Sequence, residues 1–86
     1  MKVEISPHAA DQIASRKLTR ENVIAVAEAP EQTVEREGEL PIAQSRITFE
    51  GKPALLRVAY RDEGEVRLVV TAYPTTKIDK YWQVKA

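Results

Sequence analysis

One histidine and a set of basic residues are the side chains of this sequence that could carry chemistry. His8, Gln12 and Arg16 recur at four-residue intervals, so they line one flank of any helix that contains them. His8 stands in the first turn of such a helix, where the helix dipole disfavours the imidazolium and could leave a neutral base. A neutral imidazole can accept a proton from a hydroxyl group while a nearby guanidinium stabilises the negative charge.

The composition excludes several other kinds of site. The chain has no cysteine and one histidine, which rules out thiol nucleophiles, disulfide frameworks, zinc–thiolate sites and multi-histidine metal clusters. Its three glycines, Gly38, Gly51 and Gly64, are evenly spaced along the chain and form no phosphate-cradling loop, so no nucleotide-cofactor motif is present. We therefore expect no bound metal and no cofactor.

Length and charge indicate one small, neutral domain. The 86 residues suffice for one hydrophobic core, and 13 Lys and Arg residues balance 13 Asp and Glu residues. Acidic residues gather in the connector 28–39, and the second half of the chain is basic. The longest apolar run, 23–27, is too short to cross a bilayer, and the N-terminus lacks a signal-peptide core. The sequence predicts a soluble cytoplasmic domain over residues 1–86, with no membrane partner.

Two helices are predicted at the N-terminal end. Ser6, which precedes a proline, has the features of an N-cap for a helix over about residues 7–17. Thr19 is the corresponding cap of a second helix over about residues 20–29. Pro30 ends this helix, because the residue before a proline disfavours helical geometry.

After the second helix, the apolar residues alternate along the chain, which predicts strands. The strands cover about residues 32–37, 42–50, 53–61 and 65–73, and a tail follows at 74–86. The glycines mark the turns of an antiparallel meander. The predicted fold is α+β, with the two N-terminal helices packed on one face of a four-stranded antiparallel sheet.

The strand register follows from the turns that put apolar residues on one face. A two-residue first turn, led by Gly51, pairs Ile47 with Leu56. A three-residue second turn pairs Tyr60 with Val66. The face that the helices cover then holds Ile47, Phe49, Leu56, Val58, Tyr60, Val66, Leu68 and Val70.

The opposite face is basic and aromatic. Arg46 is expected directly opposite Arg57, and like charges in this position are unfavourable unless an anion bridges them. Lys77 and Lys80 add two cations beside this face if the tail makes a helical turn. The expected residues of this face are Arg46, Thr48, Leu55, Arg57, Arg67, Val69, Thr71 and Tyr73.

These groups are the parts of metal-independent RNA cleavage. In that reaction a base takes the 2′-hydroxyl proton, an acid protonates the leaving oxygen, and arginines stabilise the charged phosphorane. Tyr73, Tyr81 or Trp82 could stack a base.

Several of these residues also have a structural interpretation. His8 can be a solvated or capping residue, and Arg46 and Arg57 can be surface residues bridged to nearby carboxylates. Tyr81 and Trp82 can pack the tail against the sheet. The convergence of the basic residues on one face is what favours a functional surface.

Three segments of the sequence resemble the DUF4258 family of small prokaryotic proteins. They are SPHAADQIASRKLTRENVIAVAEAP at the start, GKPALLRVAYRDEGEVRLVVTAY in the middle and TTKIDKYW at the end. Together they span nearly the whole chain, and the family's recurrent positions match His8, Arg16, Pro30, Arg57, Val58 and Thr71. The family is similar in fold to RelE/BrnT-type toxins of the barnase–EndoU–colicin–RelE group. The resemblance implies two helices against a four-stranded sheet, RNA cleavage without metal and a cognate antitoxin-like partner protein.

The resemblance also implies roles for single residues. The catalytic set is His8 as general base or acid, Arg16 and Arg57 as phosphate ligands, and Thr71 and Tyr73 beside the scissile group. The RNA-binding candidates are Arg46, Arg67, Lys77, Lys80 and Tyr81.

Two functions follow as hypotheses. The first is an RNase-toxin-like domain that cleaves or binds RNA. The second is a non-catalytic protein-interaction module whose exposed sheet face, including Leu55 and Val69, binds a partner.

Overall fold

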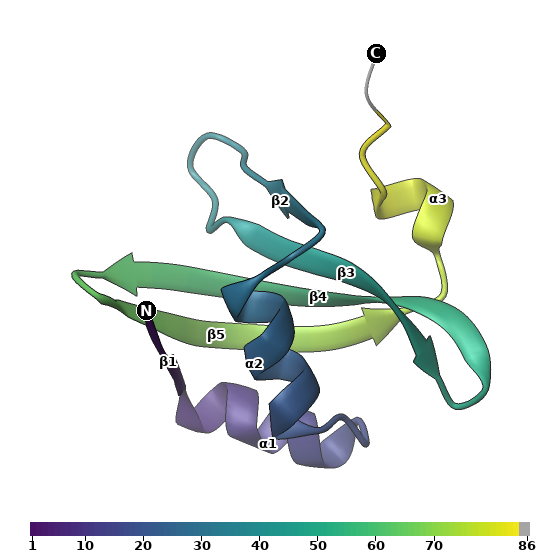
Figure 1. Cartoon of the computed structure of the whole chain (residues 1–86), viewed down its shortest axis with the longest axis horizontal. Helices are drawn as coiled ribbons and strands as arrows, with labels where there is room; N and C mark the ends of the chain where they lie inside the picture. The colour runs from purple at the N-terminus through teal and green to yellow at the C-terminus, as the bar shows by residue number, and fades with distance from the viewer. Residues whose placement is uncertain (85–86) are drawn as a thin grey trace.

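The computed structural model describes residues 1–84, which form three helices and one five-stranded mixed sheet (Figure 1). The elements are β1 (Lys2–Ile5), α1 (Pro7–Ser15), α2 (Arg20–Glu28), β2 (Gln32–Val34), β3 (Ile42–Phe49), β4 (Lys52–Glu63), β5 (Val66–Thr75) and α3 (Ile78–Tyr81). The strands lie in the order β1-β5-β4-β3-β2. The predicted α+β class is confirmed. The sheet has five strands instead of four and is not purely antiparallel, because β1 pairs with β5 in parallel.

The sequence analysis did not predict β1 or α3. β1 is four residues long, and its alternation of exposed and half-buried residues is short. Its partner is the last strand of the sheet, where Lys2 lies opposite Val66. α3 is a single turn. Local patterns do not reveal either element, because each is stabilised by a partner far away in the sequence.

Both predicted helix caps are confirmed. The Ser6 hydroxyl accepts a hydrogen bond from the Ala9 N–H at 3.1 Å, and the Thr19 hydroxyl accepts one from the Asn22 N–H at 3.1 Å. α1 ends at Ser15, earlier than predicted, because Lys17 adopts a left-handed conformation with φ 58°. These N-caps fix where each helix begins.

The predicted register between β3 and β4 is wrong by two residues. Ile47 lies opposite Ala54, not Leu56, because the turn is formed by Glu50 and Gly51. Both turn residues have positive φ, as a tight turn between twisted strands requires. A shift of two residues keeps every side chain on its predicted face.

The predicted register between β4 and β5 is also wrong, and here the faces change. Tyr60 lies opposite Val69, not Val66, and a bulge interrupts the ladder immediately beyond that pair. Over Val66–Val69 the shift is three residues, and an odd shift moves these side chains to the other face. Beyond the bulge the shift is four residues, so Thr71 and Tyr73 keep their predicted face. Val69 therefore lies in the core with the helices, and Arg67 also turns to the helix side, where it donates to the carbonyl of Ala27 in α2.

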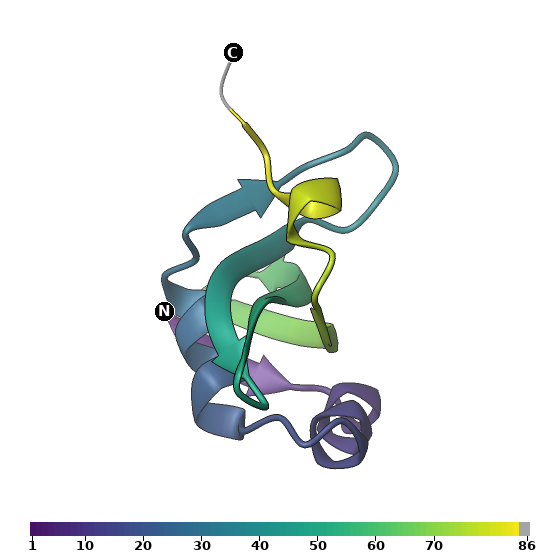
Figure 2. The ribbon, with the colours of Figure 1, turned by 90° about the vertical axis from the view of Figure 1, so that its right-hand side faces the viewer.

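The main core lies between the sheet and the first two helices. Leu56 and Val58, predicted on this face, are fully buried there. The cluster is made up of Ala9, Ile13, Val23, Val26, Ala27, Ala43, Leu56, Val58, Tyr60, Val69 and Ala72. Figure 2 shows the curved sheet with α1 and α2 along one side and α3 at the other.

The second face of the sheet is covered in part: Gln44 and Leu55 are fully buried there, whereas Arg46 and Thr48 are exposed. Leu55 and Val69, expected on an exposed face, are both fully buried, Leu55 on this second face and Val69 in the main core. The expected pairing of two arginines is wrong as well, since Arg46 lies opposite Leu55 and Arg57 lies opposite Gln44. None of the helices in the described part of the chain combines the length and apolar character needed to cross a bilayer.

Candidate functional site

An open groove runs past the end of α1, and its lining includes several of the predicted site residues. Its volume is about 480 Å³. We call it the α1–β5 groove, and its lining residues are Ser15, Arg16, Lys17, Phe49, Glu50, Tyr73 and Pro74. It brings together the end of α1, the β3–β4 turn and β5, three segments far apart in the sequence.

Two charged residues of the groove stand in backbone conformations that favour glycine. Lys17 has φ 58° and Glu50 has φ 50°, and they are the non-glycine residues with positive φ among residues 1–84. The amides of Lys17 and Leu18 bond back to the carbonyls of Ala14 and Ile13, which closes the end of α1. A left-handed conformation costs a residue with a side chain about 1–2 kcal/mol. The groove therefore holds two residues whose backbone is strained.

Arg16 is fixed by the edge of β5. β1 stops pairing after Ile5, and beyond it the Ala72 backbone is bound by one side chain of α1 and by that of Arg16, which caps the C-terminal end of α1. The Gln12 Oε1 accepts from the Ala72 N–H at 3.0 Å, and the Arg16 Nη1 donates to the Ala72 carbonyl at 2.9 Å. Arg16 remains exposed, so its other N–H groups are free to bind an anion in the groove.

Tyr73 links the groove to a buried arginine. Arg57 is only 6% exposed; its Nη1 donates to the Tyr73 hydroxyl and its Nε donates to the Gln44 Oε1 at 3.0 Å. The guanidinium also lies over the Tyr81 ring, 4.0 Å from its centre. The Tyr73 oxygen thus accepts from a cation, and its own proton is left to donate.

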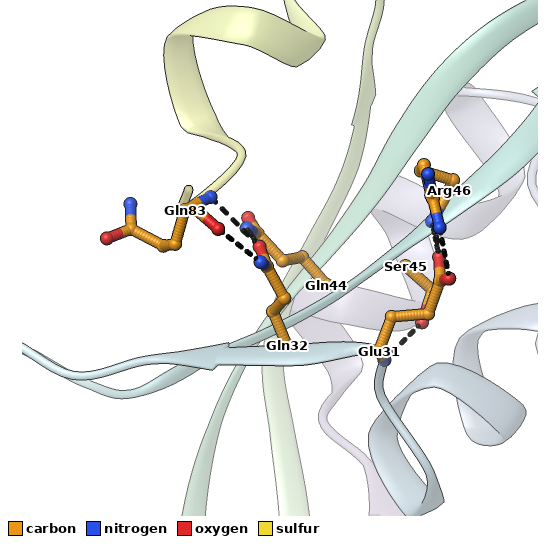
Figure 3. Close-up of polar contacts among 6 residues, drawn as sticks. All are labelled: Glu31, Gln32, Gln44, Ser45, Arg46 and Gln83. Atoms are coloured by element: carbon orange, nitrogen blue, oxygen red, sulfur yellow. Dashed lines mark hydrogen bonds and ion pairs between the residues drawn. The ribbon is translucent and has the colours of Figure 1, made fainter. Parts of the chain in front are cut away.

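Gln44 connects Arg57 to the C-terminal segment. Gln44 is fully buried, and its Nε2 donates to the Gln32 Oε1 at 2.9 Å and to the Tyr81 carbonyl at 3.0 Å. Gln32 in turn bonds both backbone groups of Gln83 (Figure 3). The tail is therefore packed against the sheet, as one interpretation of Tyr81 and Trp82 expected.

The two other predicted arginines are engaged in ion pairs. Arg46 pairs with Glu31 at 3.0 Å (Figure 3). Its guanidinium also lies over the Trp82 ring, 4.5 Å from the ring centre. Arg67 pairs with Asp62 at 2.7 Å and lies over Tyr60. Hydrogen bonds from these arginines lower the pKa of Glu31 and of Asp62 below their ordinary values. Both carboxylates are thus ionised at neutral pH, and neither arginine lines the groove.

The remaining predicted residues lie apart from the groove lining. His8 is exposed, two helical turns before Arg16, which corresponds to about 12 Å along a helix axis. Thr71 lies on the second face, opposite Ala59. Lys77 and Lys80 are exposed on and beside α3, and the Lys80 Nζ lies 5.2 Å from the centre of the Tyr81 ring. The groove thus unites Arg16 with Tyr73 and leaves His8 outside.

The sequence analysis missed the two other charged residues of the groove, Lys17 and Glu50. Lys17 follows the predicted flank of α1, and Glu50 stands beside a turn glycine. A charged residue directly before a turn glycine was the available signal for Glu50. No equivalent signal marks Lys17, because its conformation depends on how α1 ends.

Replacing Lys17 with glycine should have opposite effects on the stability of the fold and on the binding of RNA. We expect Lys17→Gly to raise the free energy of unfolding by about 1 kcal/mol, because glycine adopts positive φ without strain. If Lys17 contacts a phosphate, the same change lowers the slope of log affinity against log salt by about 0.7 for single-stranded RNA. Urea unfolding and fluorescence anisotropy with a labelled RNA at several salt concentrations measure the two effects. An unchanged salt slope would remove Lys17 from the binding surface.

Comparison with known proteins gave no further information, since no protein-family model, curated protein or solved structure matches this chain.

Proposed function

We propose that the chain is a ribonuclease-like domain that binds an RNA strand in the α1–β5 groove and cleaves it without a metal ion. The groove is open to solvent, as an extended polymer requires, and two of its lining residues are cations. Cationic grooves with an aromatic side chain are the usual surfaces for single-stranded nucleic acid.

The observation that carries this proposal is the strain at Lys17 and Glu50. Both side chains border the same groove, although glycine or asparagine would adopt the positive φ at either position at a lower energy. Backbone strain of this kind concentrates at functional sites, where the surrounding structure maintains it. An acid, a base and two cations in one groove are the groups that phosphodiester cleavage needs.

The reaction assigns one role to each group. The Glu50 carboxylate takes the proton of the 2′-hydroxyl, whose oxygen then forms a bond to phosphorus. The bond from phosphorus to the 5′-oxygen breaks, and the Tyr73 hydroxyl donates its proton to that oxygen. Arg16 and Lys17 stabilise the charged phosphorane between these steps. The products are a 2′,3′-cyclic phosphate and a 5′-hydroxyl end.

Arg57 is a positioning residue in this scheme. It touches no substrate in the groove, but its Nη1 donates to the Tyr73 oxygen. A guanidinium bonded to that oxygen stabilises the phenolate left after proton transfer. This contact also fixes the orientation of the Tyr73 ring.

The proposal is tested by incubating the purified chain with a single-stranded RNA in EDTA, beside Glu50→Gln and Glu65→Gln. Glu65 is the matched control, because it also stands in a hairpin turn but lies outside the groove. We expect Glu50→Gln to lower the cleavage rate about 10²-fold or more, and Glu65→Gln to retain it. Equal rates for the three proteins would remove Glu50 from the mechanism, and RNA that stays intact with all three folded proteins would contradict cleavage by this chain.

A further inference from the structure

A smaller cavity lies where Arg57 meets the β2–β3 connection and α3. Its volume is about 130 Å³, and its lining includes Arg36, Glu39 and Leu40 of the connection, Arg57 of β4 and Tyr81 of α3. It shares no lining residue with the α1–β5 groove. A cavity of this size admits a small group but not a drug-sized ligand.

Arg57 is a buried cation that has no acidic partner among residues 1–84. Only 6% of the residue is exposed, and its hydrogen-bond acceptors, Gln44 and Tyr73, are both neutral. Among the ion pairs formed by residues 1–84, none includes Arg57. Burying an unpaired charge is costly, and the nearby Tyr81 ring offsets only part of that cost. An anion at this place would lower the remaining cost.

The guanidinium also keeps unused donors. Arginine has five N–H groups, of which the Nε–H bonds Gln44 and one Nη1–H bonds Tyr73. No acceptor among the described residues bonds the Nη2 of Arg57. None of the fully shielded side-chain nitrogens or oxygens in that part of the chain lacks a partner, so the unbonded Nη2 keeps some exposed surface, and Arg57 is one of the residues that line the cavity.

We infer that this cavity is a binding site for a small oxyanion, the phosphate or carboxylate group whose two oxygens match one edge of a guanidinium. Such pairs form two parallel N–H···O bonds and are the strongest hydrogen bonds of arginine. Arg36 supplies a second positive charge from the connection. The Glu39 carboxylate lies in the same lining and opposes an anion, so binding depends on the balance of these two exposed charges. Anion binding in this cavity does not require that the chain cleaves RNA.

Titration with inorganic phosphate and with acetate tests this site, with sodium chloride adjusted to hold the ionic strength constant. Two signals report binding: the fluorescence of Trp82, the single tryptophan and the neighbour of Tyr81, and the ¹H–¹⁵N resonance of the Arg57 Nε. We expect saturable changes with at least one of the two anions. Saturation by phosphate alone assigns a phosphate group, and saturation by acetate alone assigns a carboxylate.

Charge variants of the connection keep the test independent of folding. Arg36 and Glu39 are exposed, so their replacement leaves the core intact. We expect Arg36→Ala to weaken binding at least threefold and Glu39→Gln to tighten it at least threefold. Glu37→Gln is the matched control, because Glu37 stands in the same connection outside the lining, and its affinity should equal that of the wild type. A response that does not saturate, or one that is equal in all four proteins, would overturn the inference.

Discussion

A Tyr73→Phe variant is expected to cleave RNA about 10²–10⁴-fold more slowly than the wild type, the range that general acid catalysis contributes. The change removes one oxygen atom, and with it the proton that the leaving 5′-oxygen receives. The ring remains, so contacts of the ring with RNA should persist and the affinity should fall less than the rate. Single-turnover cleavage and fluorescence anisotropy with a non-cleavable 2′-deoxy oligonucleotide measure the two quantities separately.

Tyr60→Phe is the matched control for this prediction. Tyr60 has the same side chain and also lies beside an arginine, but it belongs to the helix-side core. Its cleavage rate should equal that of the wild type. A Tyr73→Phe protein that cleaves at the wild-type rate would exclude Tyr73 as the acid and leave the groove with a binding role only.

A Gln44→Leu variant is expected to lose about 3 kcal/mol of unfolding free energy. Gln44 is fully buried and bonds Arg57, Gln32 and the Tyr81 carbonyl. Leucine makes none of these bonds, and each buried partner left unsatisfied costs about 1–3 kcal/mol. Because two of the bonds hold the C-terminal segment, the Trp82 emission should also shift toward that of a solvated indole. Urea unfolding followed by circular dichroism gives the first quantity, and fluorescence gives the second.

Gln83→Ala serves as its control. The backbone of Gln83, not its side chain, makes the contacts with Gln32, so this change should alter stability by less than about 0.5 kcal/mol. Should Gln44→Leu prove as stable as Gln83→Ala, the glutamine network would not be what attaches the tail to the sheet.

The helices could be predicted from the sequence because their signals are local. Ser6 and Thr19 cap helices within three residues of themselves, and Pro30 acts on its immediate neighbour. The register of β5 could not be predicted in the same way. A bulge next to the Tyr60–Val69 pair changes which residues face the helices, and the choice of turn alone does not reveal it.

The candidate site could be predicted only in part, for a related reason. Arg16 and Tyr73 were identified from their type and place on an element, and both line the groove. Lys17 and Glu50 reach it through left-handed conformations that depend on how a helix and a hairpin end. The burial of Arg57 depends on the C-terminal segment, and the sequence left open whether that segment packs against the sheet.

The chemical nature of the RNA ends is the most direct test of the central claim. The wild-type chain is incubated with a single-stranded RNA in EDTA, and the fragments are examined by mass spectrometry. The proposed mechanism predicts 2′,3′-cyclic phosphate ends paired with 5′-hydroxyl ends, because the attacking oxygen is the 2′-hydroxyl. Fragments with 3′-hydroxyl and 5′-phosphate ends, or RNA that stays intact with folded protein, would contradict it.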